Sequence, residues 1–336
     1  MSPLMKKRIR KFKNSRRGYY SLLIFASLFF VSLFAELIAN DKPILVVSRG
    51  QTYFPIFKNY PETIFGGVFE TETDYKDPFV RDMINSNGYI LMPLIEYGFN
   101  FSLGTSVLAA PSGDHILGTD DQGRDIAARM IYGFRLSVLF GLALTIASSI
   151  IGIALGAIQG YFGGWFDLAM QRFIEIWDSL PLLLILIIIS SIVVPNVYSI
   201  FFIMLAFSWM SLVSLVRAEF LRTRNLDYVR AARALGVGEF KIISRHILPN
   251  ALVSTFTFLP FILTGSITIL AELDFLGFGL PASYPSLGEA TLQGKNNLDS
   301  PWIGITAFVT LSFMLSLLMF IGEAVRDAFD PRKVVK

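Results

Sequence analysis

The residues that could carry out acid–base chemistry in this sequence are few. Only two histidines occur, His115 and His246, and both lie outside the long uncharged runs, which also contain no Asp or Glu. A Ser–His dyad, an aspartyl dyad or a carboxylate metal site inside a membrane therefore cannot form. Cysteine is absent, which excludes a thiolate nucleophile. We expect no catalytic residue and no metal ligand in this chain, and the lack of intramembrane charge argues against a proton-coupled carrier.

One glycine-rich segment resembles a phosphate-binding loop but does not meet its requirements. Residues 288–295 read GEATLQGK, with five residues between the two glycines, and Asn296 stands where Ser or Thr would bind magnesium. We therefore expect no bound cofactor or nucleotide on this chain. If the protein transports a substrate against a gradient, a partner must hydrolyse the ATP.

The elements that must position any functional residue are apolar helices. Of 336 residues 53% are hydrophobic and 16% are charged, with a mean hydropathy of +0.56, whereas an ordinary soluble domain carries about 25% charge. A bilayer-spanning helix needs about 20 apolar residues. Five uncharged runs are long enough, and the third has turn-forming Pro195 and Asn196 near its middle and counts as two spans. The runs are 18–35, 136–160, 179–216, 247–271 and 302–322. The sequence thus predicts an all-α integral membrane protein with six transmembrane helices.

The distribution of Lys and Arg orients these helices. Residues 1–17 form a basic tail without any acid, and residues 217–246 carry seven basic residues against three acids. Both are expected on the cytoplasmic side, so both termini are cytoplasmic. The expected order is a tail (1–17), the first helix (18–39), an outer segment (40–134), a core with helices 2 to 6 and a loop at 217–249 (135–327), and a tail (328–336). The net charge of +3 gives no reason to expect nucleic acid.

The two segments predicted outside allow more than one interpretation. Residues 53–101 contain twelve Phe and Tyr, which suits either a cap packed on the helix ends or a docking surface for a soluble partner, because aromatic residues are enriched at interfaces. Residues 272–301 are rich in Gly and Pro and are apolar. They form either a loop that dips toward the helices or an ordinary surface loop.

A stripe of small residues follows one face of the second predicted helix. Ser148, Gly152, Gly156 and Gly160 recur every four residues, a pattern that lets helix backbones approach closely. Helix packing is the plainer interpretation, and a gate or pathway lining is the alternative. Pro260 should kink the fifth helix.

The cytoplasmic loop between the fourth and fifth helices has the pattern of a short helix–turn–helix. Asp227 can cap a helix, alanines continue it, and Gly236 ends it. A second amphipathic stretch leads to Pro249, a tolerated position in the first turn of a helix. The loop suits insertion into a groove on a cytoplasmic partner. It equally suits a basic loop held against anionic membrane lipid.

This loop resembles the EAA motif of ABC-importer permeases, which reads Glu-Ala-Ala, three residues, Gly, nine residues, then Ile-x-Leu-Pro. Arg230 stands in place of the Glu, and His246 in place of the first Ile. The matching or adjacent positions are Asp227, Tyr228, Ala231, Ala232, Gly236, Leu248 and Pro249. LGTDDQGRD at 117–125 and DFLGFGLP at 274–281 resemble the dipeptide/oligopeptide branch of the family. Further stretches at 36–43, 217–225, 292–298 and 322–331 resemble permeases that import oligopeptides and the peptide–nucleotide antibiotic microcin C.

The resemblance implies a type I importer fold in the bacterial inner membrane and a non-enzymatic role. The implied complex contains a second homologous permease, an ABC ATPase that binds ATP and magnesium, and a periplasmic peptide-binding protein. Residues 227–249, which we call the coupling segment, would sit in the ATPase. A stand-alone channel or ion-coupled carrier is the alternative class.

Overall fold

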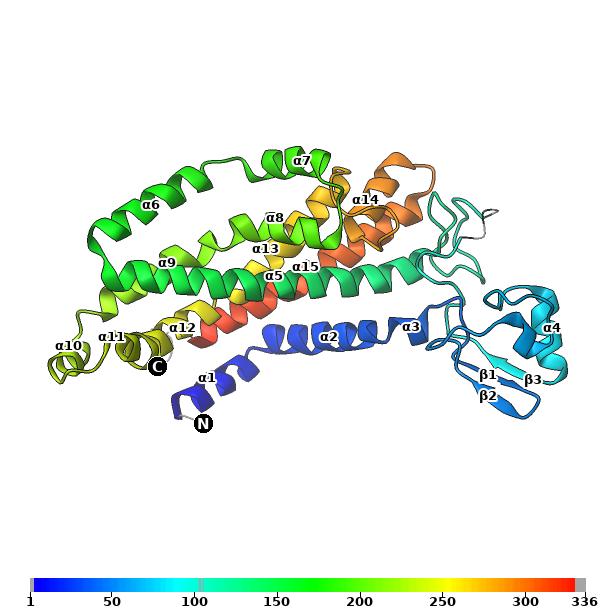
Figure 1. Ribbon diagram of the computed structural model, residues 1–336, viewed down its shortest axis with the longest axis horizontal. Coiled ribbons are helices and arrows are strands. Elements are labelled where there is room, and N and C mark those ends of the chain that lie inside the picture. Colours follow the sequence, from blue (N-terminus) through cyan, green and yellow to red (C-terminus); the bar gives the residue numbers. More distant parts are fainter. Residues whose placement is uncertain (1–2, 103, 105, 330–336) are drawn as a thin grey trace. The chain divides into compact units, whose positions relative to one another are not determined.

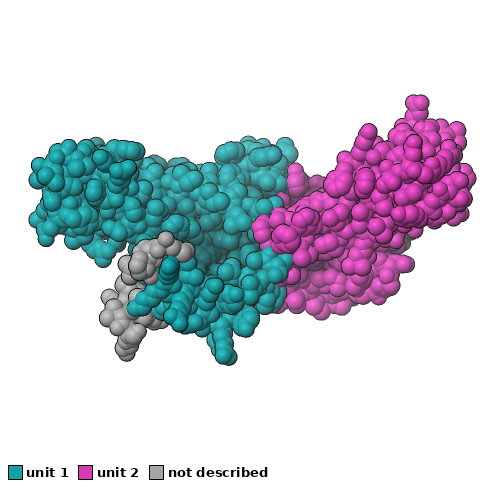
Figure 2. Space-filling view, turned by 90° about the horizontal axis from the view of Figure 1, so that it is seen from below, with its two compact units in different colours: residues 1–27, 137–281, 312–336 teal, residues 28–136, 282–311 magenta. Residues whose placement is uncertain are grey.

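A computed structural model describes residues 3–102, 104 and 106–329, which are mainly helical (Figure 1). Residues 1–2 of the expected N-terminal tail and residues 330–336 of the expected C-terminal tail lie outside the described residues. The chain divides into two compact units (Figure 2). Unit 1 comprises residues 1–27, 137–281 and 312–336, and unit 2 comprises residues 28–136 and 282–311.

Three stretches of the described chain are long and apolar enough to cross a bilayer. They are α5 (Ile126–Phe162), the stretch Val197–Thr223 made of α8 (Val197–Ser208) and α9 (Met210–Thr223), and α15 (Pro301–Phe329). Two bent helix pairs, described below, raise the number to five if each pair is one span. The first expected span corresponds to α2 (Arg16–Leu33), which is not among these, so the count of six stays a prediction.

The third expected span lies differently from its predicted position. The sequence places it from residue 179, but α7 (Leu182–Ile192) has only 11 residues, about 16 Å at 1.5 Å per residue, against a hydrocarbon core of about 30 Å. The preceding α6 (Gly164–Asp178), which lies between the uncharged runs 136–160 and 179–216, forms a bent pair with it at 71°. Pro181 lies at the break and cannot donate a backbone hydrogen bond to α6. The turn predicted at Pro195 and Asn196 is present, and Asn196 caps α8.

The fifth expected span is also broken. α12 (Leu248–Phe256) and α13 (Leu259–Phe275) are separated by two residues, and the stretch that includes α12 meets α13 at a bend of 54°. Pro260 lies in the first turn of α13, where its missing N–H has no intrahelical partner to lose. The bend predicted near Pro260 therefore falls immediately before it.

Unit 2 contains a small cap with a β-sheet, so the expectation of an all-α protein is wrong for this segment. The antiparallel order is β2–β1–β3, with β1 (Leu45–Ser48), β2 (Gln51–Tyr53) and β3 (Gly88–Leu91). α4 (Pro78–Ser86) and the 3₁₀ turn η1 (Glu62–Phe65) complete a separate apolar core. Its buried members are Val46, Phe65, Tyr75, Val80 and Ile84.

The hairpin between β1 and β2 has a local sequence signal that apolar run length does not detect. Ser48 pairs with Gln51, which leaves a two-residue turn. Arg49 and Gly50 in this turn have φ of 51° and 76°, the arrangement of a type I′ turn, which matches the right-handed twist of paired strands. The β-branched Val46 and Val47 before it favour a strand.

A partly buried ion cluster joins α4 of the cap to the segment that follows β3. Glu96 accepts hydrogen bonds from Lys76 at 2.9 Å and from Arg81 at 2.6 Å. Burial acts to raise the pKa of Glu96, but the two hydrogen-bonded cations outweigh it and hold this pKa below its ordinary value. Burial also lowers the pKa of Lys76. The carboxylate therefore prefers its charged form in the folded cap.

The segment 272–301 is more ordered than a plain loop. α13 extends to Phe275, and α14 (Leu287–Asn296) follows. The Ser286 hydroxyl accepts hydrogen bonds from the backbone N–H groups of Gly288 and Glu289, both at 3.2 Å, and so caps α14. The described chain also contains the short α3 (Ala35–Ile38) and the N-terminal α1 (Pro3–Asn14).

Candidate functional site

The coupling segment consists of three short helical pieces. α10 (Asp227–Ala234) follows α9 after a short turn, and α11 (Glu239–Lys241) and the π-helix η2 (Ile242–Ile247) lead into α12. Gly236 has a φ of 77°, which a residue with a Cβ rarely adopts, so its predicted place as a helix stop has a backbone reason. Asp227 does not cap α10 as expected, because Leu226 occupies the N-cap position and no side chain caps the helix.

The inner face of the coupling segment packs on the helices of unit 1. Val229 and Ala232 of α10 and Ile242 and Ile247 of η2 are buried in one apolar cluster. The other buried members come from α5, α9 and α12: Ala157, Tyr161, Val216, Phe220 and Ala251. The segment is therefore braced directly against these three helices, and it cannot shift without moving their side chains.

Polar contacts fasten the two ends of the segment. Asn250 of α12 donates to the Tyr228 hydroxyl at 3.2 Å, and Tyr228 donates to the carbonyl of His246 at 3.4 Å. Arg233 donates to the Tyr161 hydroxyl of α5 at 3.0 Å. Arg224 donates to the carbonyl oxygens of residues 160 and 161 at 3.2 and 3.0 Å, and these are carbonyls of the last turn of α5, where a cation is favourable.

The outer face of the segment is exposed and carries an apolar tip. Leu235 and Phe240 are each 83% exposed, and we call this pair the coupling tip. Arg230 and Ala231 are exposed on α10, whereas Ala232 is only 7% exposed. The two alanines of the motif therefore lie on different faces of α10, because adjacent residues of a helix point in different directions. Sequence reasoning missed the coupling tip, although two large apolar residues flanking glycines are its signal.

The end of the predicted motif lies at the start of α12. Leu248 is half-buried against the apolar cluster, His246 is half-buried, and Pro249 is exposed in the first turn of the helix. The structure therefore brings the beginning and end of the motif together through Tyr228, His246 and Asn250, although 18 residues separate the first two in sequence.

The small-residue stripe of α5 faces α9. A methyl group added to Gly152 would lie 2.5 Å from the carbonyl oxygen of Trp209, and one on Gly156 would lie 2.8 Å from that of Val213. At Gly160 it would lie 2.5 Å from the Cβ of Phe220. Ser148 is buried and donates to the carbonyl of residue 145 at 3.3 Å. The stripe lets two backbones approach each other, and it leads to the end of α5 that holds the coupling segment.

A partly buried ion pair fastens α6 to α9, and sequence reasoning did not find it. Arg217 donates from Nε and Nη2 to the two carboxylate oxygens of Asp167, at 2.5 and 2.7 Å. Asp167 is only 6% exposed. Such a two-pronged pair fixes orientation as well as distance, so α6 is held to the helix that leads into the coupling segment.

Unit 2 contains a second buried charge network, which accounts for part of the 117–125 motif. Arg124 donates to Asp120 at 2.7 Å and to the carbonyl of Ala282 at 2.6 Å. Arg129 donates to Glu289 of α14 at 2.6 Å. All four charged side chains are buried. Because buried charges are costly unless paired, this network fixes the segment before α14 against the start of α5.

The chain matches the model of one protein family over more than half of its length. Residues 152–335 match the "Binding-protein-dependent transport system inner membrane component". The chain therefore belongs to this family of transport permeases, and the matched residues include the coupling segment, α9 and the last part of α5 from residue 152 onward.

Similar curated proteins are permeases of ABC transport systems. The "Inner membrane ABC transporter permease protein YejE" of Escherichia coli is 56% identical over 338 residues, covering 100% of this chain and 99% of the relative. The "Peptidoglycan transport system permease protein YejE" of Agrobacterium fabrum is 56% identical over 362 residues, covering 100% and 95%. The "Oligopeptide transport system permease protein OppC" of Lactococcus lactis is 36% identical over 233 residues, covering 68% and 79%.

A solved structure shares the fold. It describes inward-facing conformations of the MetNI methionine ABC transporter and covers 60% of this chain and 96% of its own, with a TM-score of 0.50 and 17% identity. At this identity the likeness concerns the fold alone. The chain is thus a helical permease with the fold of an ABC-importer subunit, and it is a transport subunit rather than an enzyme.

Proposed function

We propose that this chain forms half of the translocation pathway of an ABC importer for peptides, with its coupling segment seated in a cytoplasmic ATPase. The observation that carries this proposal is the coupling tip, two exposed apolar side chains on a segment braced against α5, α9 and α12. A large apolar side chain that is exposed on a segment packed firmly against helices is typical of a surface that becomes buried in a partner protein.

The proposed complex contains a second homologous permease, an ABC ATPase and a periplasmic peptide-binding protein. ATP and magnesium bind to the ATPase in this proposal, and this chain holds no cofactor. Closure of the ATPase would displace the coupling tip. The buried contacts of Val229 and Ala232 would pass that displacement to α9 and α5, because close-packed side chains transmit movement rather than absorb it.

The proposed substrates are peptides released outside the inner membrane. One relative is named for peptidoglycan transport and another for oligopeptide transport, and the sequence resemblance extends to importers of microcin C. We therefore propose oligopeptides as the general class, with peptides cut from peptidoglycan and microcin C-like conjugates as members to be compared in one uptake assay.

We further propose that the cap of unit 2 docks the binding protein. Phe57 and Val68 on its loops are 81% and 83% exposed, and we call this pair the cap tip. Exposed aromatic and apolar groups are enriched at interfaces.

The coupling role is tested with the assembled importer in proteoliposomes. Leu235→Asp combined with Phe240→Asp should reduce peptide-stimulated ATP hydrolysis at least about tenfold, because two apolar hot-spot contacts are lost. Leu298→Asp, at a position 80% exposed in unit 2, is the matched control. Unchanged stimulation in the double variant would refute the role, and failure of the tagged chain to co-purify an ATPase would favour a stand-alone channel.

The proposed topology has six spans and two cytoplasmic termini, and the cysteine-free sequence allows a direct test. Leu94→Cys and Leu298→Cys should react with a membrane-impermeant maleimide in intact cells. Lys13→Cys and Leu235→Cys should react only after permeabilisation. Reaction of Lys13→Cys in intact cells would contradict the orientation.

A further inference from the structure

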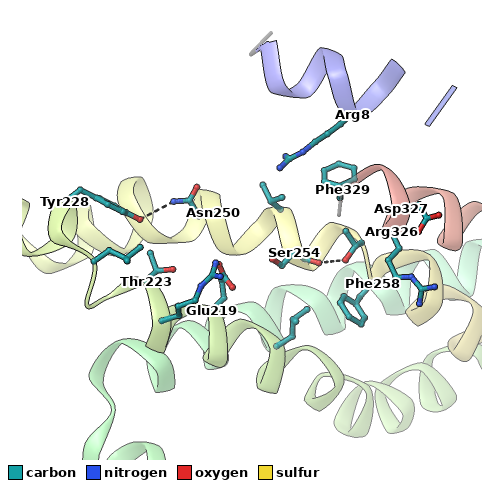
Figure 3. A pocket seen from close by; sticks show the side chains of 15 residues that line it. Arg8, Glu219, Thr223, Tyr228, Asn250, Ser254, Phe258, Arg326, Asp327 and Phe329 are labelled. Carbon is teal, nitrogen blue, oxygen red and sulfur yellow. Dashed lines mark hydrogen bonds and ion pairs between the residues drawn. The ribbon is translucent and has the colours of Figure 1, made fainter. Parts of the chain in front are cut away.

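A cavity of about 620 Å³ lies in unit 1 beside the coupling segment. Its walls come from α1, α9, α12 and α15, and Tyr228 at the start of α10 also lines it (Figure 3). The hydrogen bond between Tyr228 and Asn250, which fastens the coupling segment, therefore forms part of the wall. Among the described residues that line this cavity, Tyr228 is the one that belongs to the coupling segment.

Three arginines from three different helices line the cavity. The guanidinium carbon of Arg8 in α1 lies 4.9 Å from the centre of the Phe329 ring, and both side chains are drawn in Figure 3. Arg326 of α15 lies 5.8 Å from the ring centre of Phe261. Arg222 of α9 is paired with Glu219. With Asp327 as the other acid in the wall, the lining carries three cations and two anions, so it favours an anionic ligand.

The rest of the lining is largely apolar. Leu215, Val253, Phe258 and Phe329 all contribute to the wall. A small inorganic anion would gain nothing from these side chains, and a purely apolar ligand would gain nothing from the arginines. The combination fits an amphiphile with a negatively charged head and a hydrocarbon tail.

Helix α1, which contributes Arg8, would concentrate such a ligand at the cavity. Its sequence from Pro3 to Asn14 contains six Lys and Arg and no acid. A basic cluster beside a membrane helix attracts anionic lipid, by about 1 kcal/mol for each cation near the surface. The chain lies in a membrane that supplies such lipids.

We propose that this cavity binds one anionic phospholipid, with its phosphate between Arg8 and Arg326 and an acyl chain along Val253 and Phe258. The bound lipid contacts the wall that includes Tyr228 and Asn250, so its presence stabilises the fastened position of the coupling segment. The proposal requires only that the chain lies in a membrane, and it is independent of the transported substrate.

The test counts lipids retained by the full-length chain in native mass spectrometry, with phosphatidylglycerol or phosphatidylcholine added to the delipidated protein. We expect one tightly retained phosphatidylglycerol and no retained phosphatidylcholine. Arg8→Gln and Arg326→Gln should each weaken retention at least about tenfold, because each removes a charged hydrogen-bond donor to the phosphate. Arg10→Gln removes only a surface charge, from an exposed position of α1 outside the cavity, and should weaken retention by no more than about fivefold.

A second variant addresses the cavity itself. Ser254→Trp places a large side chain into it from α12 and should abolish tight retention, with circular dichroism confirming unchanged helix content. Equal retention of the two lipids, an equal loss in Arg10→Gln, or full retention in folded Ser254→Trp would each overturn the proposal. Displacement of the lipid by millimolar inorganic phosphate would also overturn it, because a free-anion site would then suffice.

Discussion

The coupling tip and the cap tip expose similar groups on different supports. Leu235 and Phe240 are each 83% exposed, and Phe57 and Val68 are 81% and 83% exposed. The coupling tip stands on a buried cluster shared with α5, α9 and α12. The cap tip lies on loops of the cap, whose three-stranded sheet has its own core that includes residues from β1, η1 and α4.

This difference separates two tasks that an exposed apolar surface can have. A surface whose supporting core includes long helices can pass a displacement to them, because packed interiors are stiff. A surface on a separate small core can hold a partner without moving the helices. We infer that damage beneath the coupling tip uncouples the transporter, whereas damage beneath the cap tip weakens only docking.

The sharpest test of the first region uses two adjacent alanines. Ala232→Asp places a carboxylate in the buried cluster and should destabilise unit 1 by about 3 kcal/mol, seen as a lower thermal unfolding midpoint in detergent. Ala231→Asp, on the exposed face, should change stability by less than about 0.5 kcal/mol but reduce coupled ATP hydrolysis. Equal unfolding midpoints for the two variants would contradict the division of faces.

Substitutions at the contact between α5 and α9 should have the next largest effect on stability. Gly156→Val introduces a side chain whose Cβ would lie 2.8 Å from the carbonyl oxygen of Val213, so overpacking should cost about 2 kcal/mol and reduce transport. Gly265→Val in α13 is the matched control, because a Cβ there meets nothing within 4 Å. If both substitutions had the same effect, helix propensity rather than close approach would explain it.

In the cap, the hairpin turn depends on one glycine. Gly50→Ala should destabilise β1 and β2 by about 1 kcal/mol, since φ is 76° and a Cβ there is strained even in open space. Gly113→Ala, where a Cβ is also unobstructed and φ is not positive, should cost much less. Amide hydrogen exchange should be faster in the hairpin and unchanged in the coupling segment; faster exchange in both would break the proposed independence.

The smallest expected effect is a pH dependence confined to the cap. The pKa of Glu96 is lower in the folded cap than its ordinary value of 4.5. Its contribution to stability is therefore complete above about pH 4.5 and is lost as the pH falls through the lowered pKa. Amide exchange of α4 should accelerate over that range relative to the intrinsic rate. Glu96→Gln should remove this pH dependence. If amide exchange in the variant kept the full pH dependence, another titratable group would be responsible for it.

Run length and charge correctly indicated a helical membrane protein, because bilayer thickness imposes a length that a sequence displays directly. Run length and charge did not correctly predict the helices that are short or broken. α6 contains four charged residues, Asp167, Arg172, Glu175 and Asp178, and so lies outside the uncharged runs. One of these charges is neutralised by Arg217, 50 residues away, which no local pattern reveals.

The motif located the candidate site in the sequence, but it did not show which residues of the site are buried and which are exposed. Ala231 and Ala232 are chemically identical neighbours, and only the packing of α10 shows which one is buried. The cap was misjudged for a different reason. Its strands are only three or four residues long, so the Arg49–Gly50 turn was a stronger signal than any periodicity.

The π-helix η2 gives the coupling segment an unusual register. Its i→i+5 hydrogen bonds enclose one residue more per turn than an α-helix does, and it lies directly between the coupling tip and α12. Removing one residue, for example Ser244, would allow an ordinary α-helix. Everything before the deletion would then turn by about 100° relative to α12, since each residue of an α-helix advances by that angle. The length of this stretch therefore sets the direction in which the coupling tip points, and its evolution by insertion or deletion is tied to the shape of the surface that receives the tip.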